Sequence, residues 1–489
     1  MKISSVDIEI AAGEPGGRLI IAADHVLRRI DRTPWREVEP LLAHIVTTDH
    51  SISLVGWQQV SADAESVTLR HPRLRQIAYP HEWCAEMLLE AARLHCRLLA
   101  AIAPCGFTLK DAHPWNVLFD GIRPVFVDIG SVVPVGTLSK LDYLRYRPRR
   151  PLAAAVFHLM FLPFFVCPLA FHQAGLGNTA RQVLWAYALN STHRLPRLTD
   201  YLSMVPPRHW HRFARAVLTM RQANRKFNKV AAALARDGSL SQFAAGLSSI
   251  VESLAPLPAS SAYTSYYAAK GEEHDFDITE SWNAKQINVK SLLAIPEIVT
   301  VLDIACNTGW YARLAARLGK RVTAVDVDAA CIGALYRTAT DESEDIVPLV
   351  ANILAPSPAR HHYNGGLLLI DSSQRLGGDA VLALGILHHL VLGSGMALRD
   401  ALRRLAAPAK RLLIVEFVAL EDSVVVDEPG FFAAFSRNRE DFAGYSLQEA
   451  CAALDVNHWD VKLMPSYPST RTLLVCSRRV PIARLPANS

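Results

Sequence analysis

The run Val301-Leu302-Asp303-Ile304-Ala305-Cys306-Asn307-Thr308-Gly309-Trp310-Tyr311 decides the fold class of the C-terminal part of the chain. Its apolar start predicts a buried strand, its small residues predict a tight turn, and an amphipathic helix is expected after Gly309. Such a turn brings the backbone close to a ligand, and the N–H groups at the helix start favour a carboxylate. We therefore expect Asp303, Ala305, Asn307 and Gly309 to bind a cofactor.

The predicted strands at 321–325 and 346–350 are each followed by a polar residue that could also bind the cofactor. Asp326 ends the strand that starts at Arg321, and a carboxylate in this place can accept hydrogen bonds from both hydroxyls of a ribose. Asn352 follows the third apolar run, where we expect it near an adenine. A dinucleotide loop needs G-x-G-x-x-G, whereas this turn has only Gly309. The pattern therefore disfavours NAD and favours a ligand without a pyrophosphate.

Strands and helices alternate after residue 285, which predicts an α/β fold with a mostly parallel sheet covered by helices on both faces. The predicted strands lie near residues 299–304, 321–325, 346–350, 379–384, 411–417 and 471–476. The uncharged, Pro- and Ser-rich stretch that starts at residue 256 predicts a linker. We therefore expect an N-terminal domain at 1–255, a linker at 256–284 and a Rossmann-like domain at 285–480.

Three segments resemble class I S-adenosylmethionine-dependent methyltransferases: VLDIACNTGWYARLAARLGKRVTAVDVD (301–328), DAVLALGILHHL (379–390) and LLIVEFV (412–418). Most of residues 12–476 is similar to a bacterial two-part group that includes nodulation-type methyltransferases. The residues that carry this second resemblance lie at 79–83, 109–112, 123–128 and 356–358. The resemblance implies S-adenosylmethionine as the cofactor, with its carboxylate at the turn after Asp303.

Two histidines follow the fourth strand, on the side where a methyl acceptor would lie. His388 or His389 could act as a general base if the acceptor must lose a proton. Either could equally pack or orient a loop. Alignment of the reactants can also accelerate methyl transfer without any base.

The N-terminal part contains a motif that is similar to a protein-kinase catalytic loop. In LKDAHPWNVLFDGIRPVFVDIG (109–130), Asp111 and Asn116 have the D-x-x-x-x-N spacing, and Asp128 follows twelve residues after Asn116. The His-Arg before the aspartate is absent, and neither a phosphate-binding glycine loop nor a strand lysine is evident, with Arg28 and Arg29 nearest. We therefore expect an α+β, degraded kinase-like domain that binds or docks substrate rather than transferring phosphate.

Composition bears on three further questions: nucleic-acid binding, metal sites and membrane spans. The net charge of +5 over 489 residues argues against a dedicated nucleic-acid binder. The eight cysteines show no C-x-x-C spacing, which predicts reduced, cytoplasmic thiols and no structural metal site. Residues 152–171 are apolar enough to span a membrane, but two prolines and a histidine interrupt them, so we expect buried core helices that break near the prolines.

The pattern therefore predicts a methyltransferase that acts on a small-molecule or glycan acceptor. Three alternatives stay open: a bifunctional enzyme with an active kinase-like half, an RNA methyltransferase, and a binding protein without catalysis. The RNA alternative depends on residues 201–236, which contain eight arginines and lysines and no acidic residue. A solvated helix face is the simpler explanation of the same stretch. The sequence leaves the oligomeric state and the acceptor atom open.

Overall fold

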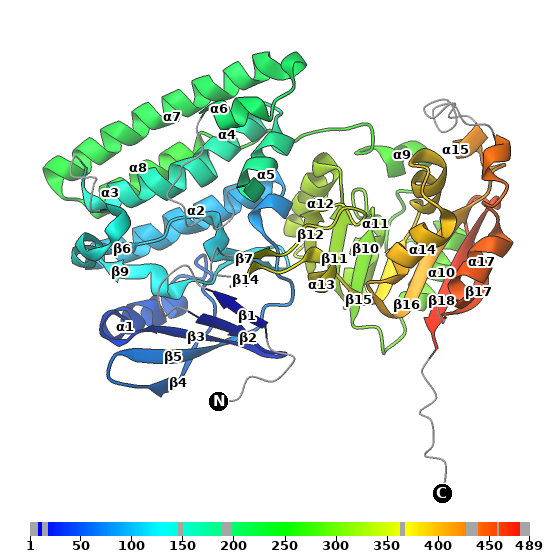
Figure 1. Ribbon diagram of the computed structural model, residues 1–489, viewed down its shortest axis with the longest axis horizontal. Coiled ribbons are helices and arrows are strands. Elements are labelled where there is room, and N and C mark those ends of the chain that lie inside the picture. Colours follow the sequence, from blue (N-terminus) through cyan, green and yellow to red (C-terminus); the bar gives the residue numbers. More distant parts are fainter. Residues whose placement is uncertain are drawn as a thin grey trace, which may run out of the picture. The chain divides into compact units, whose positions relative to one another are not determined.

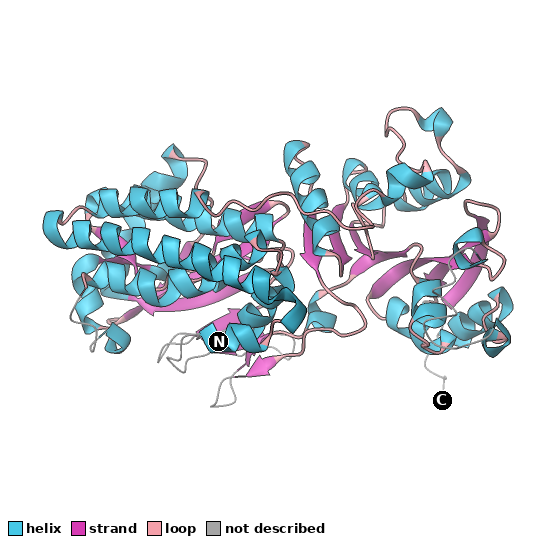
Figure 2. Ribbon diagram, turned by 90° about the horizontal axis from the view of Figure 1, so that it is seen from above, coloured by secondary structure: helices cyan, strands magenta, loops and turns pink. Residues whose placement is uncertain are grey.

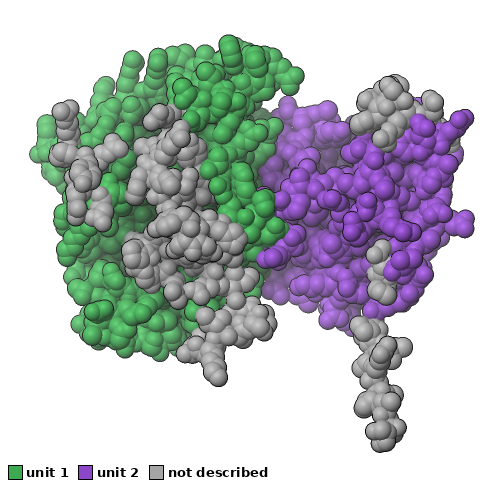
Figure 3. Space-filling model, viewed as in Figure 1, with its two compact units in different colours: residues 1–259, 358–371 green, residues 260–357, 372–489 purple. Residues whose placement is uncertain are grey.

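The computed structural model describes residues 8–11, 18–144, 150–186, 198–361, 367–426, 439–456 and 459–479. It divides into two compact units, which Figure 3 shows in different colours. Unit 1 comprises Met1–Ala259 together with Pro358–Asp371, and unit 2 comprises Ser260–Ser357 together with Ser372–Ser489. The division differs from the predicted one in two places. Residues 260–284 belong to unit 2, and a short stretch from the middle of the C-terminal half belongs to unit 1.

Unit 1 begins with a seven-stranded sheet in the order β13-β14-β1-β2-β3-β5-β4. Its strands are β1 (Ile8–Ala11), β2 (Arg18–Ile21), β3 (His25–Asp31), β4 (Gln58–Ala62), β5 (Ser66–Pro72), β13 (Arg360–His361) and β14 (Leu367–Leu369). Every pair is antiparallel except β1 with β14. The excursion of residues 358–371 therefore extends this sheet by two strands (Figure 1).

Helix α1 (Arg32–Thr48) follows β3, and two small two-stranded sheets follow helix α2 (Ala85–Ile102). β6 (Phe107–Leu109) pairs with β9 (Val132–Pro134), and β7 (Val117–Asp120) pairs with β8 (Arg123–Phe126). The stretch at 51–55 makes only an isolated bridge, between Leu54 and Phe126.

From residue 150 to residue 252 the described part of unit 1 is mostly helical. Its helices are α3 (Leu152–Val156), the π-helical segment η7 (Phe157–Val166), α4 (Cys167–Gln173), α5 (Gly177–Ala186), α6 (Leu198–Ser203), α7 (Trp210–Asp237) and α8 (Leu240–Glu252). The helix from Leu152 to Gln173 has the length and hydropathy of a membrane span, and 67% of its most apolar window is buried inside the protein. We expected a break near the prolines, but the helix continues through Pro163, because the backbone widens into π-helical turns there.

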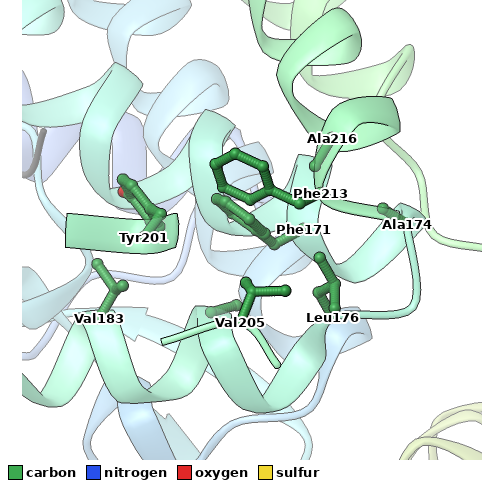
Figure 4. Packing of buried hydrophobic residues seen from close by; sticks show 9 residues of the cluster. Phe171, Ala174, Leu176, Val183, Tyr201, Val205, Phe213 and Ala216 are labelled. Atoms are coloured by element: carbon green, nitrogen blue, oxygen red, sulfur yellow. The ribbon is translucent and has the colours of Figure 1, made fainter. Parts of the chain in front are cut away.

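Aromatic packing joins α4 to α6 and α7. The ring of Phe171 stacks on Tyr201 at a centroid distance of 4.7 Å and meets Phe213 at 5.9 Å (Figure 4). Phe213 and Ala216 turn the first part of α7 towards this core. The orientation of α7 is therefore set by its buried side, and the other side of the helix is left to solvent.

Unit 2 contains a second seven-stranded sheet, in the order β12-β11-β10-β15-β16-β18-β17. Its strands are β10 (Thr300–Ile304), β11 (Arg321–Asp326), β12 (Ile346–Val350), β15 (Gly378–Ala383), β16 (Ala409–Val418), β17 (Trp459–Pro465) and β18 (Arg471–Arg478). The first five strands in this order are parallel, and β18 and β17 are antiparallel additions at one edge. The predicted mostly parallel sheet is confirmed, although β17 was not predicted.

Helices cover both faces of this sheet (Figure 2). They are α10 (Ala284–Leu293), α11 (Trp310–Arg317), α12 (Ala329–Asp341), α13 (Ser372–Arg375), α14 (Leu398–Ala406) and α17 (Leu447–Val456), with the short helices α9 (Tyr266–Lys270) and α15 (Ser423–Val426) at its ends. Consecutive residues of β10, β12 and β16 are buried, which requires cover on both sides because neighbouring side chains point to opposite faces.

Candidate active site

The turn after β10 is held in a strained conformation. Ala305, Asn307 and Gly309 have φ angles of 57°, 54° and 82°, all in the left-handed region. That region is unfavourable for alanine, and such residues cluster at functional sites. Gly309 is required for a second reason, because a Cβ atom there would lie 2.4 Å from the side chain of Leu335. The glycine therefore serves helix packing as well as the turn.

Asp326 connects the ends of the first two strands. Its Oδ2 accepts a hydrogen bond from the N–H of Asn307 (2.9 Å), and its Oδ1 accepts one from the N–H of Asp328 (2.8 Å). A carboxylate has about four lone-pair positions, so it can still accept hydroxyl donors. Burial raises the pKa of Asp326, and the two backbone bonds oppose that shift.

Asp303 lies at the end of β10 and is 3% exposed. The backbone N–H of Ala312, in the first turn of α11, acts to lower the pKa of the Asp303 carboxyl group. Oδ2 of Asp303 has no hydrogen-bond partner among the described residues. Burial, together with the nearby charge of Asp326, raises the pKa of Asp303 to about 8. The site therefore contains a buried acceptor that a cationic donor would satisfy.

Asn352 and the two histidines follow the carboxyl ends of strands β12 and β15, as the sequence predicted. Asn352 follows β12, is exposed, and accepts the N–H of Leu354 at its Oδ1 (2.9 Å). His388 follows β15 and is buried, and its ring centroid lies 4.2 Å from that of His389. Burial lowers the pKa of His388 to about 3, and the charge of His389 acts in the same direction. His388 is therefore neutral near pH 7 and a weak proton acceptor.

A buried ion network lies at the ends of β16 and β18, and sequence analysis missed it. Lys285 Nζ donates to Glu416 Oε2 (3.1 Å) and lies 3.8 Å from Glu272 Oε2. The guanidinium of Arg471 donates from Nε to Asp422 Oδ2 (2.9 Å) and lies 3.9 Å from Glu416. Hydrogen bonds from Arg471 hold the pKa of Asp422 down at about 2, against the effect of burial. A single acidic residue inside the apolar strand LLIVEFV was the available signal.

The segment predicted as a linker packs against this end of unit 2. The side chain of Asn307 donates from Nδ2 to the carbonyl oxygen of Tyr263 (3.0 Å), and Trp310 Nε1 donates to that of His274 (2.9 Å). Phe276 stacks on the ring of Trp310 at 5.0 Å. Residues 260–284 are thus tied to the turn and to the first residue of α11, which explains why they do not form a free linker.

In unit 1, the kinase-like residues form a hydrogen-bonded scaffold. Asn116 Nδ2 donates to the carbonyl oxygen of Asp111 (2.8 Å), and the hydroxyl of Ser131 bonds to the N–H and the carbonyl of the same residue at 3.0 Å each. Asp128 forms an ion pair with Arg28 from β3. The two side chains are 23% and 15% exposed, so this pair is partly shielded from water.

Comparison with known proteins gives one relative along most of the chain. The chain is 25% identical over 427 residues to nodulation protein NoeA from Rhizobium meliloti (strain 1021), covering 84% of this chain and 85% of NoeA. No family model matches the chain.

Solved structures resemble a smaller part of the chain. Magnesium protoporphyrin IX methyltransferase ChlM from Synechocystis PCC 6803, with bound S-adenosylhomocysteine, matches at 16% identity and a TM-score of 0.30, covering 44% of this chain and 97% of ChlM. N-methyltransferase NodS from Bradyrhizobium japonicum WM9, also with S-adenosylhomocysteine, matches at 13% identity and a TM-score of 0.29. The match covers 44% of this chain and 100% of NodS. The bifunctional kinase-methyltransferase WbdD matches at 16% identity and a TM-score of 0.29, and the match covers 42% of each chain. The similarity to a nodulation protein along most of the chain agrees with the resemblance that the sequence predicted.

Proposed function

We propose that unit 2 is an S-adenosylmethionine-dependent methyltransferase that acts on a small-molecule or glycan acceptor. The observation that carries the proposal is the hydrogen bond between Asn307 and Asp326, which joins a strained turn to the end of the neighbouring strand. Ligands of open α/β sheets bind beyond the carboxyl ends of the strands, where both residues lie. S-adenosylmethionine, when bound, supplies an electrophilic methyl group.

The charges of the site support a cationic cofactor. The ion network contains three carboxylates, Glu272, Glu416 and Asp422, and two cations, Lys285 and Arg471. All five side chains are nearly or fully buried, so one formal negative charge is left uncompensated there. The cofactor has one net positive charge, from a sulfonium, an ammonium and a carboxylate, which balances this excess.

In this proposal the chain's own residues bind and orient. Asp326 accepts the ribose hydroxyls, Asp303 Oδ2 accepts the ammonium group, and the turn residues Ala305, Asn307 and Gly309 let the backbone approach the ligand. Asn352 lies towards the adenine. The low pKa of His388 favours orientation over proton transfer, and His389 remains the candidate base.

Calorimetry with S-adenosylhomocysteine tests the cofactor assignment. We expect one site per chain, and we expect Asp326→Ala to weaken binding at least tenfold, or about 1.4 kcal/mol. The matched control is Asp341→Ala, at the exposed end of α12, which should bind as the unaltered chain does. Equal affinities of both variants would remove Asp326 from the site. Mass-spectrometric screening of candidate acceptors for the gain of one methyl group tests the reaction itself.

For unit 1 we propose a kinase-like scaffold that selects the acceptor and does not transfer phosphate. Asp111, Asn116 and Asp128 lie in the segments that connect the paired strands β6–β9 and β7–β8. In an active kinase the aspartate at the position of Asp128 holds a metal ion, and the pairing of Asp128 with Arg28 supports a structural role instead. The free state of all eight cysteines supports a cytoplasmic location.

A further inference from the structure

Helix α7 presents a long cationic surface to solvent. Over its 28 residues it is about 42 Å long, at 1.5 Å per residue. No acidic residue occurs between Asp200 and Asp237. Six exposed cations lie on α7, and Arg208 lies just before the helix. We call these seven residues the α7 basic face: Arg208, Arg215, Arg221, Arg225, Lys226, Lys229 and Arg236. None of them forms an ion pair with a described carboxylate.

The fold fixes which side of α7 faces outward. Buried residues Phe213, Ala216, Ala223, Phe227, Ala231 and Leu234 recur at three-, four- and seven-residue steps and form one stripe. The opposite stripe contains Leu218, Arg225, Lys229 and Arg236, because steps of four, seven and eleven residues return to the same side of a helix. In Figure 1 α7 runs along the outer edge of the helical layer of unit 1.

The spacing of the cations on α7 destabilises the helix, and nothing in the fold of unit 1 requires that spacing. Arg221, Arg225 and Lys229 are spaced four residues apart, and like charges at this spacing repel and destabilise a helix. No carboxylate on α7 before Asp237 offsets the repulsion. An external anion would offset it.

Apolar side chains next to the cations decide between anionic partners. Trp210 is 54% exposed and Leu218 is 58% exposed. Leu198 and Leu202 on α6 are also exposed, one short turn before α7 begins. A phosphate backbone gives exposed leucines nothing to contact, whereas the boundary of a lipid bilayer takes up tryptophan and leucine while its headgroups attract arginine and lysine.

We propose that the α7 basic face, with Trp210 and Leu218, binds the surface of an anionic membrane. The protein lies on the bilayer and does not cross it. The charges attract the headgroups, and the apolar side chains enter the headgroup region. Such binding would bring unit 1 to acceptors that are themselves held at a membrane.

The test is sedimentation of the full-length protein with vesicles of phosphatidylcholine alone, or with 30% phosphatidylglycerol, at 50 and 500 mM NaCl. We expect binding to the anionic vesicles at low salt, at least tenfold weaker binding at high salt, and none to neutral vesicles. Arg221→Gln/Arg225→Gln/Lys229→Gln should reduce partitioning at least tenfold, because each cation near the surface contributes roughly fivefold. Leu218→Ser should reduce it several-fold at either salt concentration.

The matched control removes three exposed cations from the strands of unit 2: Arg321→Gln/Arg411→Gln/Lys462→Gln. It has the same net charge as the α7 variant and should bind vesicles normally. Equal losses in both variants, with unfolding curves unchanged, would show that only overall charge matters and would overturn the proposal. Binding to a 20-nucleotide RNA at 150 mM NaCl, without binding to anionic vesicles, would also overturn it in favour of a nucleic-acid partner.

Discussion

Lys285 Nζ lies 3.1 Å from Glu416 Oε2, although 131 residues separate the two in the chain. Glu416 also accepts the hydroxyl of Ser466 (2.6 Å), so each of its oxygens has a donor. The pair links α10 to the end of β16, at the edge of the sheet where the candidate site lies. A buried ion pair of this kind fixes geometry more surely than it adds stability.

The Lys285–Glu416 pair gives the first prediction. Lys285→Met should destabilise the protein by about 3–5 kcal/mol, because it leaves a buried carboxylate without its main partner. Urea unfolding measures the loss. Lys410→Met, an exposed position on β16, is the control and should stay within about 0.5 kcal/mol. Adding Glu416→Gln to Lys285→Met should recover part of the loss; a loss of less than about 1 kcal/mol in the single variant would refute the account.

Asp303 gives a prediction on pH. The folded pKa of about 8 is far above the ordinary value of 3.8, so between these pH values the folded state keeps a proton that the unfolded state has lost. The contribution of Asp303 to stability therefore falls as pH rises from about 4 to 8. Unfolding of the ligand-free protein at pH 5 and pH 8 should show a larger decrease for the unaltered chain than for Asp303→Asn. Parallel decreases would contradict the assigned pKa.

The same group should couple cofactor binding to proton release. The ammonium group of a ligand bound beside Asp303 favours the ionised carboxylate, so binding of S-adenosylhomocysteine at pH 7 should release up to about one proton. Calorimetry in phosphate and in Tris buffers measures this as a difference in binding heat. The difference should vanish in Asp303→Asn. Identical heats for the unaltered chain would separate Asp303 from the cofactor.

The two histidines can be distinguished by their titration. With a pKa of about 3, His388 should give a nuclear magnetic resonance signal that does not move between pH 5 and 8. Once an acceptor is known, His388→Ala should bind cofactor and change turnover without shifting the acidic limb of the pH profile. If that limb shifts in His388→Ala, the residue is the base after all; if it shifts in His389→Ala, the remaining candidate is supported.

The Arg28–Asp128 pair leads to a prediction for unit 1. The full chain with ATP and magnesium or manganese should show no hydrolysis beyond that of Asp111→Ala. Asp128→Ala should lower the unfolding midpoint, because it strands a partly buried guanidinium, and should leave S-adenosylhomocysteine binding unchanged. ATP hydrolysis that disappears in Asp111→Ala while the fold is intact would instead support a bifunctional enzyme.

Local sequence signals were enough to predict the sheet of unit 2 and the edge at which its candidate site lies. Apolar runs that end in Asp303 and Asp326 are local signals, and the rule that parallel strands open to ligands at their carboxyl ends places them together. The unusual turn could also be anticipated, although the packing of Gly309 against Leu335 could not, because it depends on how closely two helices approach.

The long-range contacts could not be predicted from the sequence. The ion network of Lys285, Glu416 and Arg471 joins residues that lie far apart in the chain, and residues 358–371 leave one sheet to extend another. The boundary at residue 260 likewise depends on aromatic contacts of Phe276 and Trp310. Local propensity contains no information on such contacts, because their energy comes from burial and charge pairing that exist only once distant segments have met.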